Sequence, residues 1–126
     1  MKRFFTLLTI GAVLSSFTFF SSIDEVITAM KTGSSADIAR FFDNTVELNM
    51  PEKANSYSKS QAELVLRDFF STNAVKTFTV NHKGENAGSQ FCIGTLVTKG
   101  STYRTTVFMK LKGDKQLLQT ITFERQ

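Results

Sequence analysis

The sequence predicts an α+β domain in which N-terminal helices pack on a strongly curved antiparallel sheet. Apolar residues recur at helical spacing up to about residue 70, and that spacing is lost from Val75 onward. After Val75, alternating runs are separated by short glycine-containing turns, which is typical of successive antiparallel strands. Phe-Phe doublets at 41–42 and 69–70 end the last two helical patterns.

The first 22 residues have the layout of a secretory signal peptide. Lys2 and Arg3 precede an apolar run from Phe4 to Phe20, and serines follow it. An uncleaved membrane anchor is the alternative, although the run is short for the roughly 20 residues that span a bilayer. We therefore expect an exported protein, periplasmic or extracellular, in which residues 23–126 form one domain.

Composition excludes several classes of function. Removing residues 1–22 removes Lys2 and Arg3, so the net charge falls from +4 to +2. What remains has no block of lysines and arginines, and we expect no nucleic-acid partner. Cys92 is the single cysteine and His82 the single histidine, so no internal disulfide, metal site or cofactor is expected.

Three helices are expected before Val75. The first covers residues 22–33, with a capping box formed by Ser22 and Glu25, and the second covers residues 34–44. The third covers residues 58–73, and its apolar positions share one face. These positions are Ala62, Val65, Leu66, Phe69 and Phe70, and a second capping box is expected at Ser60 and Glu63.

The Phe-Phe doublets are interpreted as broad apolar stripes. Consecutive helix residues point about 100° apart, so two adjacent phenylalanines widen the buried face of a helix. A wide stripe suits a helix that lies across a sheet better than one in a narrow coiled-coil seam. Two helices of this kind are expected to cover one curved sheet face.

Strands are expected on both sides of the third helix. Residues 44–50 alternate, with Val46 and Leu48 on the buried side and Glu47 on the solvent side, and a short return strand follows near Tyr57. The segments after the helix are expected to pair as consecutive antiparallel neighbours. These segments are residues 76–84, 89–100, 101–115 and 116–126.

Gly94 interrupts the strand that contains Cys92. A bulge at Gly94 is predicted to bring Phe91, Ile93 and Leu96 onto one face, and a close helix approach over the glycine is the alternative. Cys92 lies in mid-strand between two large apolar residues, so it is interpreted as a small buried hydrophobic residue.

The order of elements resembles the nuclear transport factor 2-like (cystatin-like) fold. The likeness is carried by FFDNTVELNM, by SYSKSQAELVLRDFF and by the meander IGTLVT, TYRTTVFMKLK and LLQTITFE. The pattern also resembles a family of small secreted bacterial domains of unknown function, over nearly all of residues 23–126. The resemblance implies a cone-shaped sheet wrapped around the long helix and implies no chemistry, because this superfamily includes enzymes and non-enzymes.

A small apolar ligand in the cone is one expected partner. Strand parity places His82 on the face of Phe78 and Val80, which the resemblance makes the concave face. Tyr103 shares its parity with Val107 and Met109 on the neighbouring strand. Together these six residues form the predicted ligand site, with His82 or Tyr103 meeting the polar end of the ligand. The alternative for His82 is a hydrogen bond that fixes the adjacent turn.

Three further readings remain open from the sequence. A steroid-isomerase-like enzyme would use a pocket histidine or carboxylate with a tyrosine hydroxyl, but Glu47 has outward parity and Tyr57 and Tyr103 have no evident carboxylate partner. A domain tethered by an uncleaved N-terminus would meet the membrane there alone. A homodimer would use the outer sheet face. This face is expected to carry Thr77, Thr79, Arg104, Thr106, Phe108, Lys110, Thr120 and Thr122.

Overall fold

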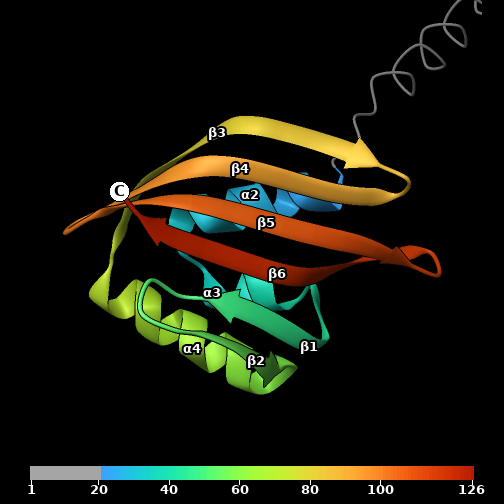
Figure 1. Ribbon diagram of the computed structural model, residues 1–126, viewed down its shortest axis with the longest axis horizontal. Coiled ribbons are helices and arrows are strands. Elements are labelled where there is room, and N and C mark those ends of the chain that lie inside the picture. Colours follow the sequence, from blue (N-terminus) through green and yellow to red (C-terminus); the bar gives the residue numbers. More distant parts are fainter. Residues whose placement is uncertain (1–20) are drawn as a thin grey trace, which may run out of the picture.

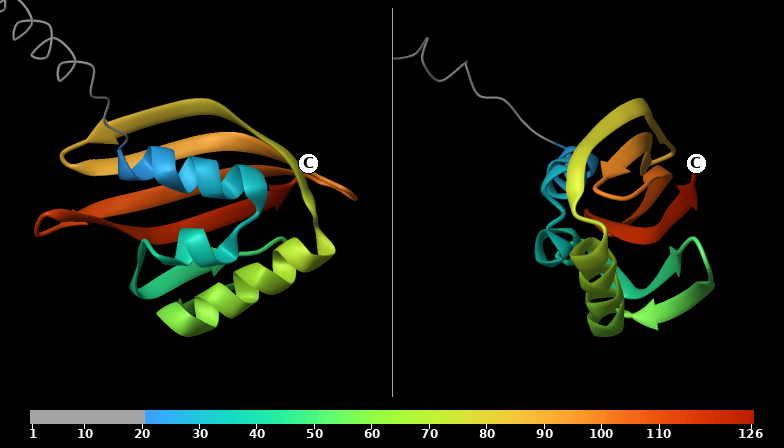
Figure 2. Two further views of the ribbon diagram at one scale, coloured as in Figure 1. Left: turned by 180° about the vertical axis from the view of Figure 1, so that it is seen from behind. Right: turned by 90° about the vertical axis from the view of Figure 1, so that its left-hand side faces the viewer.

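The computed structural model describes residues 21–126, so the predicted signal peptide lies outside the described residues except for Ser21 and Ser22. In the described part, three helices lie against one face of a curved six-stranded sheet (Figures 1 and 2). The α+β fold predicted from the sequence is confirmed. The elements are α2 Ser22–Thr32, α3 Ser35–Ala39, β1 Phe42–Asn49, β2 Ala54–Ser58, α4 Lys59–Thr72, β3 Val75–Asn86, β4 Ser89–Thr98, β5 Thr102–Lys112 and β6 Lys115–Arg125.

The sheet is almost entirely antiparallel. Its strand order is β2-β1-β6-β5-β4-β3, so the last four strands form the predicted meander. β1 pairs antiparallel with β2 and parallel with β6, and this joins the first part of the chain to the last. The second view in Figure 2 shows the sheet bending around the helices, which occupy its concave side.

The helices begin earlier than the capping boxes predicted. Ser21, rather than Ser22, caps α2, and its hydroxyl accepts from the backbone N–H of Asp24. The box that starts α4 consists of Ser58 and Gln61, two residues before the predicted Ser60. Glutamine serves as well as glutamate at the third helical position, so the capping-box motif fits both Ser58 and Ser60 and does not by itself determine where the helix begins.

The first Phe-Phe doublet is not helical, which corrects the sequence prediction. α3 ends at Ala39, and Phe42 is the first residue of β1. The carbonyl of Phe41 instead accepts from the backbone N–H of Leu118 in β6. A sheet hydrogen bond therefore takes the place of another helical turn, while Phe42 still enters the core.

The second doublet ends a helix as predicted. Phe69 and Phe70 are both buried in the last turns of α4. The Phe69 ring meets Tyr103 edge-on with centroids 5.2 Å apart, and it lies 4.5 Å from the ring of Phe123. These contacts connect α4 to the inner face of β5 and β6.

The predicted bulge at Gly94 is wrong. Alternate residues of β4 stay buried throughout the strand, so Leu96 faces inward while Phe91 and Ile93 face outward. The bulge lies in the partner strand β3, between the residues paired with Gly94 and Ile93. Gly94 has a different role: a Cβ there would lie 2.7 Å from the ring of Phe78, so glycine makes room for that ring.

Asp43 joins the start of β1 to the ends of β5 and β6. Its carboxylate accepts from Lys112 Nζ at 2.6 Å, from Gln119 Nε2 at 2.9 Å and from the backbone N–H of Asn44 at 2.7 Å. Gln119 is positioned for this contact by a bulge in β6. These hydrogen bonds, that of Lys112 most of all, lower the pKa of Asp43 to about 2.

Phe69→Ala tests the aromatic contact between helix and sheet. Loss of a buried phenylalanine ring and the cavity left behind should lower the free energy of unfolding by about 3–5 kcal/mol. Leu64→Ala on the same helix is the control, because Leu64 is 48% exposed and should lose less than about 1 kcal/mol. Urea titrations followed by circular dichroism measure both, and equal losses would contradict this role of Phe69.

Asp43→Asn tests the carboxylate contact through its pH dependence. Because the pKa of Asp43 is lowered in the fold, its charged form stabilises the protein above the ordinary value of 3.8, and that contribution is lost as pH falls toward about 2. We expect the variant to melt below wild type near neutral pH and the gap to close in acid. Asp114→Asn, in the exposed β5–β6 turn, is the control and should follow wild type. A gap independent of pH would contradict the assignment.

Candidate functional site

Four of the six predicted ligand residues face the concave side and pack into the core. Phe78, Tyr103, Val107 and Met109 are 3%, 1%, 0% and 0% exposed. Val80 is partly buried against them and also borders a shallow surface hollow beside α2. The shared parity of Tyr103, Val107 and Met109 is confirmed, and the inner face there is filled by protein side chains. Contact of these residues with a ligand stays a prediction.

His82 does not share their face, which corrects the prediction from parity. Val80 pairs with Gly94 and His82 pairs with Ile93, so Asn81 is an extra residue that reverses the alternation. His82 is exposed on the convex side, where its ring lies 5.4 Å from that of Phe91. His82 and Tyr103 therefore lie on opposite faces of the sheet and cannot line the same cavity.

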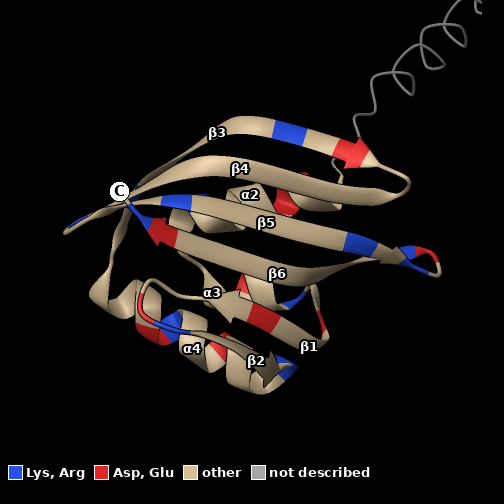
Figure 3. Ribbon diagram, in the orientation of Figure 1, with Lys and Arg blue, Asp and Glu red and all other residues tan. Residues whose placement is uncertain are grey.

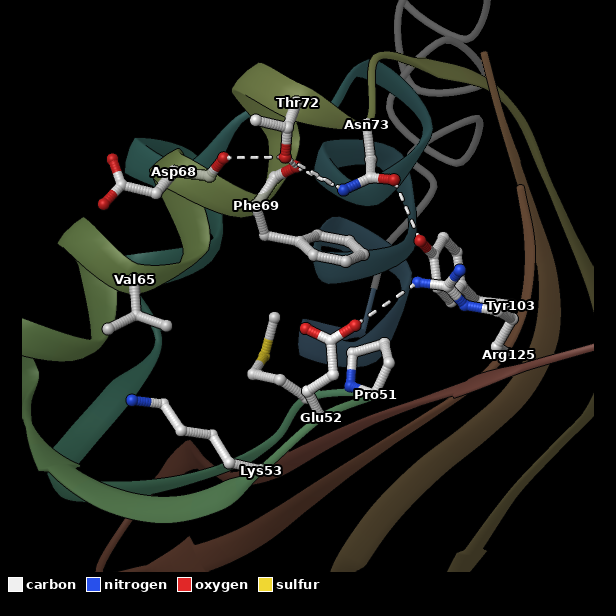
Figure 4. A pocket seen from close by; sticks show the side chains of 11 residues that line it. Pro51, Glu52, Lys53, Val65, Asp68, Phe69, Thr72, Asn73, Tyr103 and Arg125 are labelled. Atoms are coloured by element: carbon white, nitrogen blue, oxygen red, sulfur yellow. Dashed lines mark hydrogen bonds and ion pairs between the residues drawn. The ribbon is translucent and has the colours of Figure 1, made fainter. Parts of the chain in front are cut away.

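Tyr103 borders a hollow that the sequence did not predict as a unit. We call it the Tyr103 pocket; it has a volume of about 400 Å³ and lies where the C-terminal half of α4, the β1–β2 turn and the Tyr103–Arg125 end of the β5–β6 ladder converge (Figure 4). Its lining residues are Met50, Pro51, Glu52, Lys53, Val65, Asp68, Phe69, Thr72, Asn73, Tyr103 and Arg125.

A hydrogen-bonded wall closes the inner side of this pocket. Asn73 caps the C-terminus of α4, and its side-chain amide donates to the carbonyl of Phe69 at 3.0 Å. The Tyr103 hydroxyl donates to the Asn73 side-chain oxygen at 2.9 Å. The amide thus links the helix end to the sheet and holds the tyrosine ring beside Phe69. Because Tyr103 is almost wholly buried, it forms the floor of the pocket.

The outer rim is charged. Arg125 stands opposite Tyr103 in the β5–β6 ladder, and its guanidinium carbon lies 5.7 Å from the centre of that ring. Glu52, in the β1–β2 turn, approaches Arg125 with N···O 3.9 Å. Lys53 follows in the same turn, and Asp68 lies on the α4 side, away from Arg125 (Figure 4). The pocket therefore combines an apolar floor with charged groups at its mouth.

A second hollow, of about 510 Å³, lies between α2 and α3. Phe41 provides its aromatic surface, and two of the lining residues, Thr28 and Thr32, turn their hydroxyls back to carbonyls of α2. In the Tyr103 pocket, by contrast, α4 with its C-cap and β5 arrange two aromatic rings and a hydrogen-bonded amide around one hollow. The Tyr103 pocket is therefore the stronger candidate.

Cys92 is poorly suited to act as a nucleophile. Burial raises the pKa of the Cys92 thiol to about 11, which keeps it protonated at neutral pH. Among residues 21–126, no group of three histidine, cysteine or acidic side chains is placed to hold a metal ion. In the same range, no helix has the length and apolar character needed to cross a membrane.

Sequence reasoning found Tyr103 and missed most of its neighbours. Asn73 follows a helix of predictable length, and an asparagine at a helix end is a recognisable capping signal. Arg125 has the inward parity of Phe123, so correct pairing of β5 with β6 would have placed it beside Tyr103. The β1–β2 turn comes from a segment distant in sequence from both, and no local pattern indicates that it closes the pocket.

Residues 23–124 match the family model described as a domain of unknown function, DUF4783. The crystal structure of a DUF4783 family protein from Bacteroides uniformis is similar, with a TM-score of 0.81 and 29% identity over 84% of this chain and 98% of that chain. A DUF4783 family protein from Bacteroides ovatus has a TM-score of 0.79 and 31% identity, over 85% and 96% of the two chains.

A more distant likeness shows the fold alone. An NTF2-like protein of unknown function from Cytophaga hutchinsonii has a TM-score of 0.61 and 13% identity, over 86% of this chain and 93% of that chain. No curated protein matches the sequence. From the family match and these structures together, the chain belongs to the DUF4783 family, a domain of unknown function with an NTF2-like α+β fold.

Proposed function

We propose that this domain is an exported, non-catalytic binding module whose Tyr103 pocket holds the apolar part of a small amphiphilic ligand. One observation carries the proposal: a hollow of about 400 Å³ combines an apolar floor of Val65, Phe69 and Tyr103 with a charged mouth. Ligand sites commonly span about 300–1,000 Å³ and pair an apolar lining with a few polar groups that orient the guest.

The N-terminal sequence supports export. Lys2, Arg3 and the apolar run up to Phe20 are the features of a signal peptide. Ser21 caps α2, and loss of a serine cap destabilises a helix by about 0.5–2 kcal/mol. Processing at any position before Ser21 would keep this cap, so we place the cleavage before Ser21 rather than after Ser22.

The steroid-isomerase-like alternative has less support. The Tyr103 hydroxyl donates its proton to an amide oxygen rather than facing a carboxylate across a cavity. His82 lies on the opposite face of the sheet, and Glu47 is exposed on the outer side of β1. A carboxylate and a hydroxyl donor aimed at the same substrate atom, which that chemistry needs, are not brought together by these residues.

Val65→Phe tests the pocket by filling it. The protein, purified as its host processes it, should enhance the fluorescence of the uncharged amphiphile N-phenyl-1-naphthylamine. We expect the larger side chain to weaken this binding at least about tenfold, because it occupies the space beside Phe69. Leu64→Phe is the matched control: the same side chain is added one residue earlier, at an exposed position outside the pocket.

Two results would contradict the proposed pocket. One is that wild-type protein does not enhance the fluorescence of the probe and that native mass spectrometry detects no co-purified ligand bound to it. The other is Val65→Phe protein that binds the probe as well as the Leu64→Phe control does. Matching thermal melts of the two variants ensure that any difference comes from the pocket.

The outer sheet face supports a second proposal, self-association into a homodimer. This face lacks charge over its centre, and β4 carries no charged residue (Figure 3). Arg104 and Glu124 lie toward one end of the β5–β6 ladder and Lys110 lies toward the other. An uncharged centre with a charged margin matches the depletion of charged residues at the core of protein interfaces. The central side chains are Thr79, Phe91, Ile93, Thr95, Thr106, Phe108, Thr120 and Thr122.

A second copy is the occupant that we propose for this face, because two copies of one face with an uncharged centre can stack without burying an unpaired charge there.

Phe108→Lys, at a residue that is 38% exposed in the centre, should raise the dimer dissociation constant at least about tenfold. Leu111→Lys, near the β5–β6 turn, is the control. Sedimentation over a range of concentrations measures both, and a wild-type protein that stays monomeric would exclude the dimer.

A further inference from the structure

The neutral side chains of the Tyr103 pocket have already used their hydrogen-bond donors. The Asn73 amide donates to the carbonyl of Phe69 and to the hydroxyl of Thr72, and the Thr72 hydroxyl lies against helix carbonyls. The Tyr103 hydroxyl donates to Asn73. Among the lining side chains, the donors left for a guest are therefore those of Lys53 and Arg125, and both are cationic.

Arg125 is the better placed of the two. The backbone of Arg125 is held by its strand pairing with Tyr103, and the guanidinium lies over the tyrosine ring. This contact orients a planar group whose parallel N–H bonds match a carboxylate. Figure 4 shows the guanidinium beside the Tyr103 ring at one side of the pocket, where it meets Glu52.

The present partner of Arg125 is held weakly. The closest N···O distance to Glu52 is 3.9 Å, and the Glu52 side chain is 89% exposed. An ion pair this long between exposed groups is easily exchanged, because solvent screens it and the side chains gain freedom on release. Glu52 therefore pairs with the Arg125 guanidinium, but the carboxylate of a ligand could replace it there.

We propose that the Tyr103 pocket selects an anionic amphiphile: a carboxylate that pairs with Arg125, on an apolar chain that packs against Val65 and Phe69. This inference rests on the proposed function of the pocket and adds the charge and shape of the head group. A cationic guest is disfavoured because the acidic groups are dispersed, with Asp68 on the helix side and Glu52 almost wholly in solvent.

The test uses ligands that differ in the head group alone. Decanoate and decanamide have the same chain and nearly the same shape, and only decanoate is charged. By calorimetry below micelle-forming concentrations, we expect wild type to bind decanoate at least about tenfold more tightly than decanamide. Decyl sulfate, whose head is tetrahedral, should bind less tightly than decanoate, and decylammonium should bind least.

Three variants assign the effect to the rim. Arg125→Gln should abolish the preference for the charged head group, so that the variant binds decanoate no more tightly than it binds decanamide. Glu52→Gln should strengthen decanoate binding severalfold, because it removes the competing carboxylate. Arg104→Gln is the control: Arg104 also pairs with a glutamate, at 3.8 Å, and is 54% exposed, but it lies on the outer face. It should bind all the ligands as wild type does.

The outcomes separate this inference from the proposed function. If decanamide binds as tightly as decanoate, or if Arg125→Gln and Arg104→Gln behave alike, the pocket binds amphiphiles but the anion selectivity is refuted. If wild type binds decyl sulfate more tightly than decanoate, the head group that the pocket prefers is not a carboxylate. If it binds decylammonium more tightly than decanoate, the pocket prefers a cation rather than an anion. If no decyl compound binds wild type, the proposed function itself fails.

Discussion

The packing of Phe69 against the concave sheet determines much of the rest of the molecule. Its ring contacts Tyr103 and Phe123, which lie on neighbouring strands, so a single side chain joins α4 to the adjoining ends of β5 and β6. The helix itself lies along β1 and β2, and β1 pairs with β6, so α4 is in contact with both halves of the chain. The Tyr103 pocket lies directly beside this cluster, and its floor consists of the outer edge of the core.

The same helix end supplies the polar wall of the pocket. The carbonyl of Phe69 accepts from both the backbone and the side chain of Asn73, and this holds the amide where the Tyr103 hydroxyl can reach it. A helix terminus with unsatisfied carbonyls needs such donors, so one asparagine both caps the helix and orients the tyrosine. Stability of the helix end and shape of the pocket are therefore two consequences of the same hydrogen bonds.

Period-two alternation predicted most of the fold and failed where a strand gains a residue. Inward positions of β5, such as Tyr103, Val107 and Met109, followed directly from the sequence. The bulge at Asn81 reversed the parity of His82, and the bulge was assigned instead to the strand containing Gly94 because glycine is the usual local signal. A Cβ at that glycine would meet the ring of Phe78 and the backbone carbonyl oxygen of Thr79, both on the neighbouring strand, and a local sequence pattern cannot show such contacts. The pocket was missed for the same reason, since it is assembled from distant segments.

Alternation also gives the two faces of the meander separate chemical roles. Tyr103 faces the pocket and Arg104, the next residue, faces outward, while on the paired strand Glu124 faces outward and Arg125 lines the pocket. Two arginine–glutamate pairs thus lie at the same end of the sheet, one on each side. Because these side chains project from one rigid β-ladder in opposite directions, a substitution on one face changes that surface while leaving the backbone under the other in place. A ligand at the pocket and a partner on the outer face would therefore bind the domain independently, unless either one altered the twist of β5 and β6.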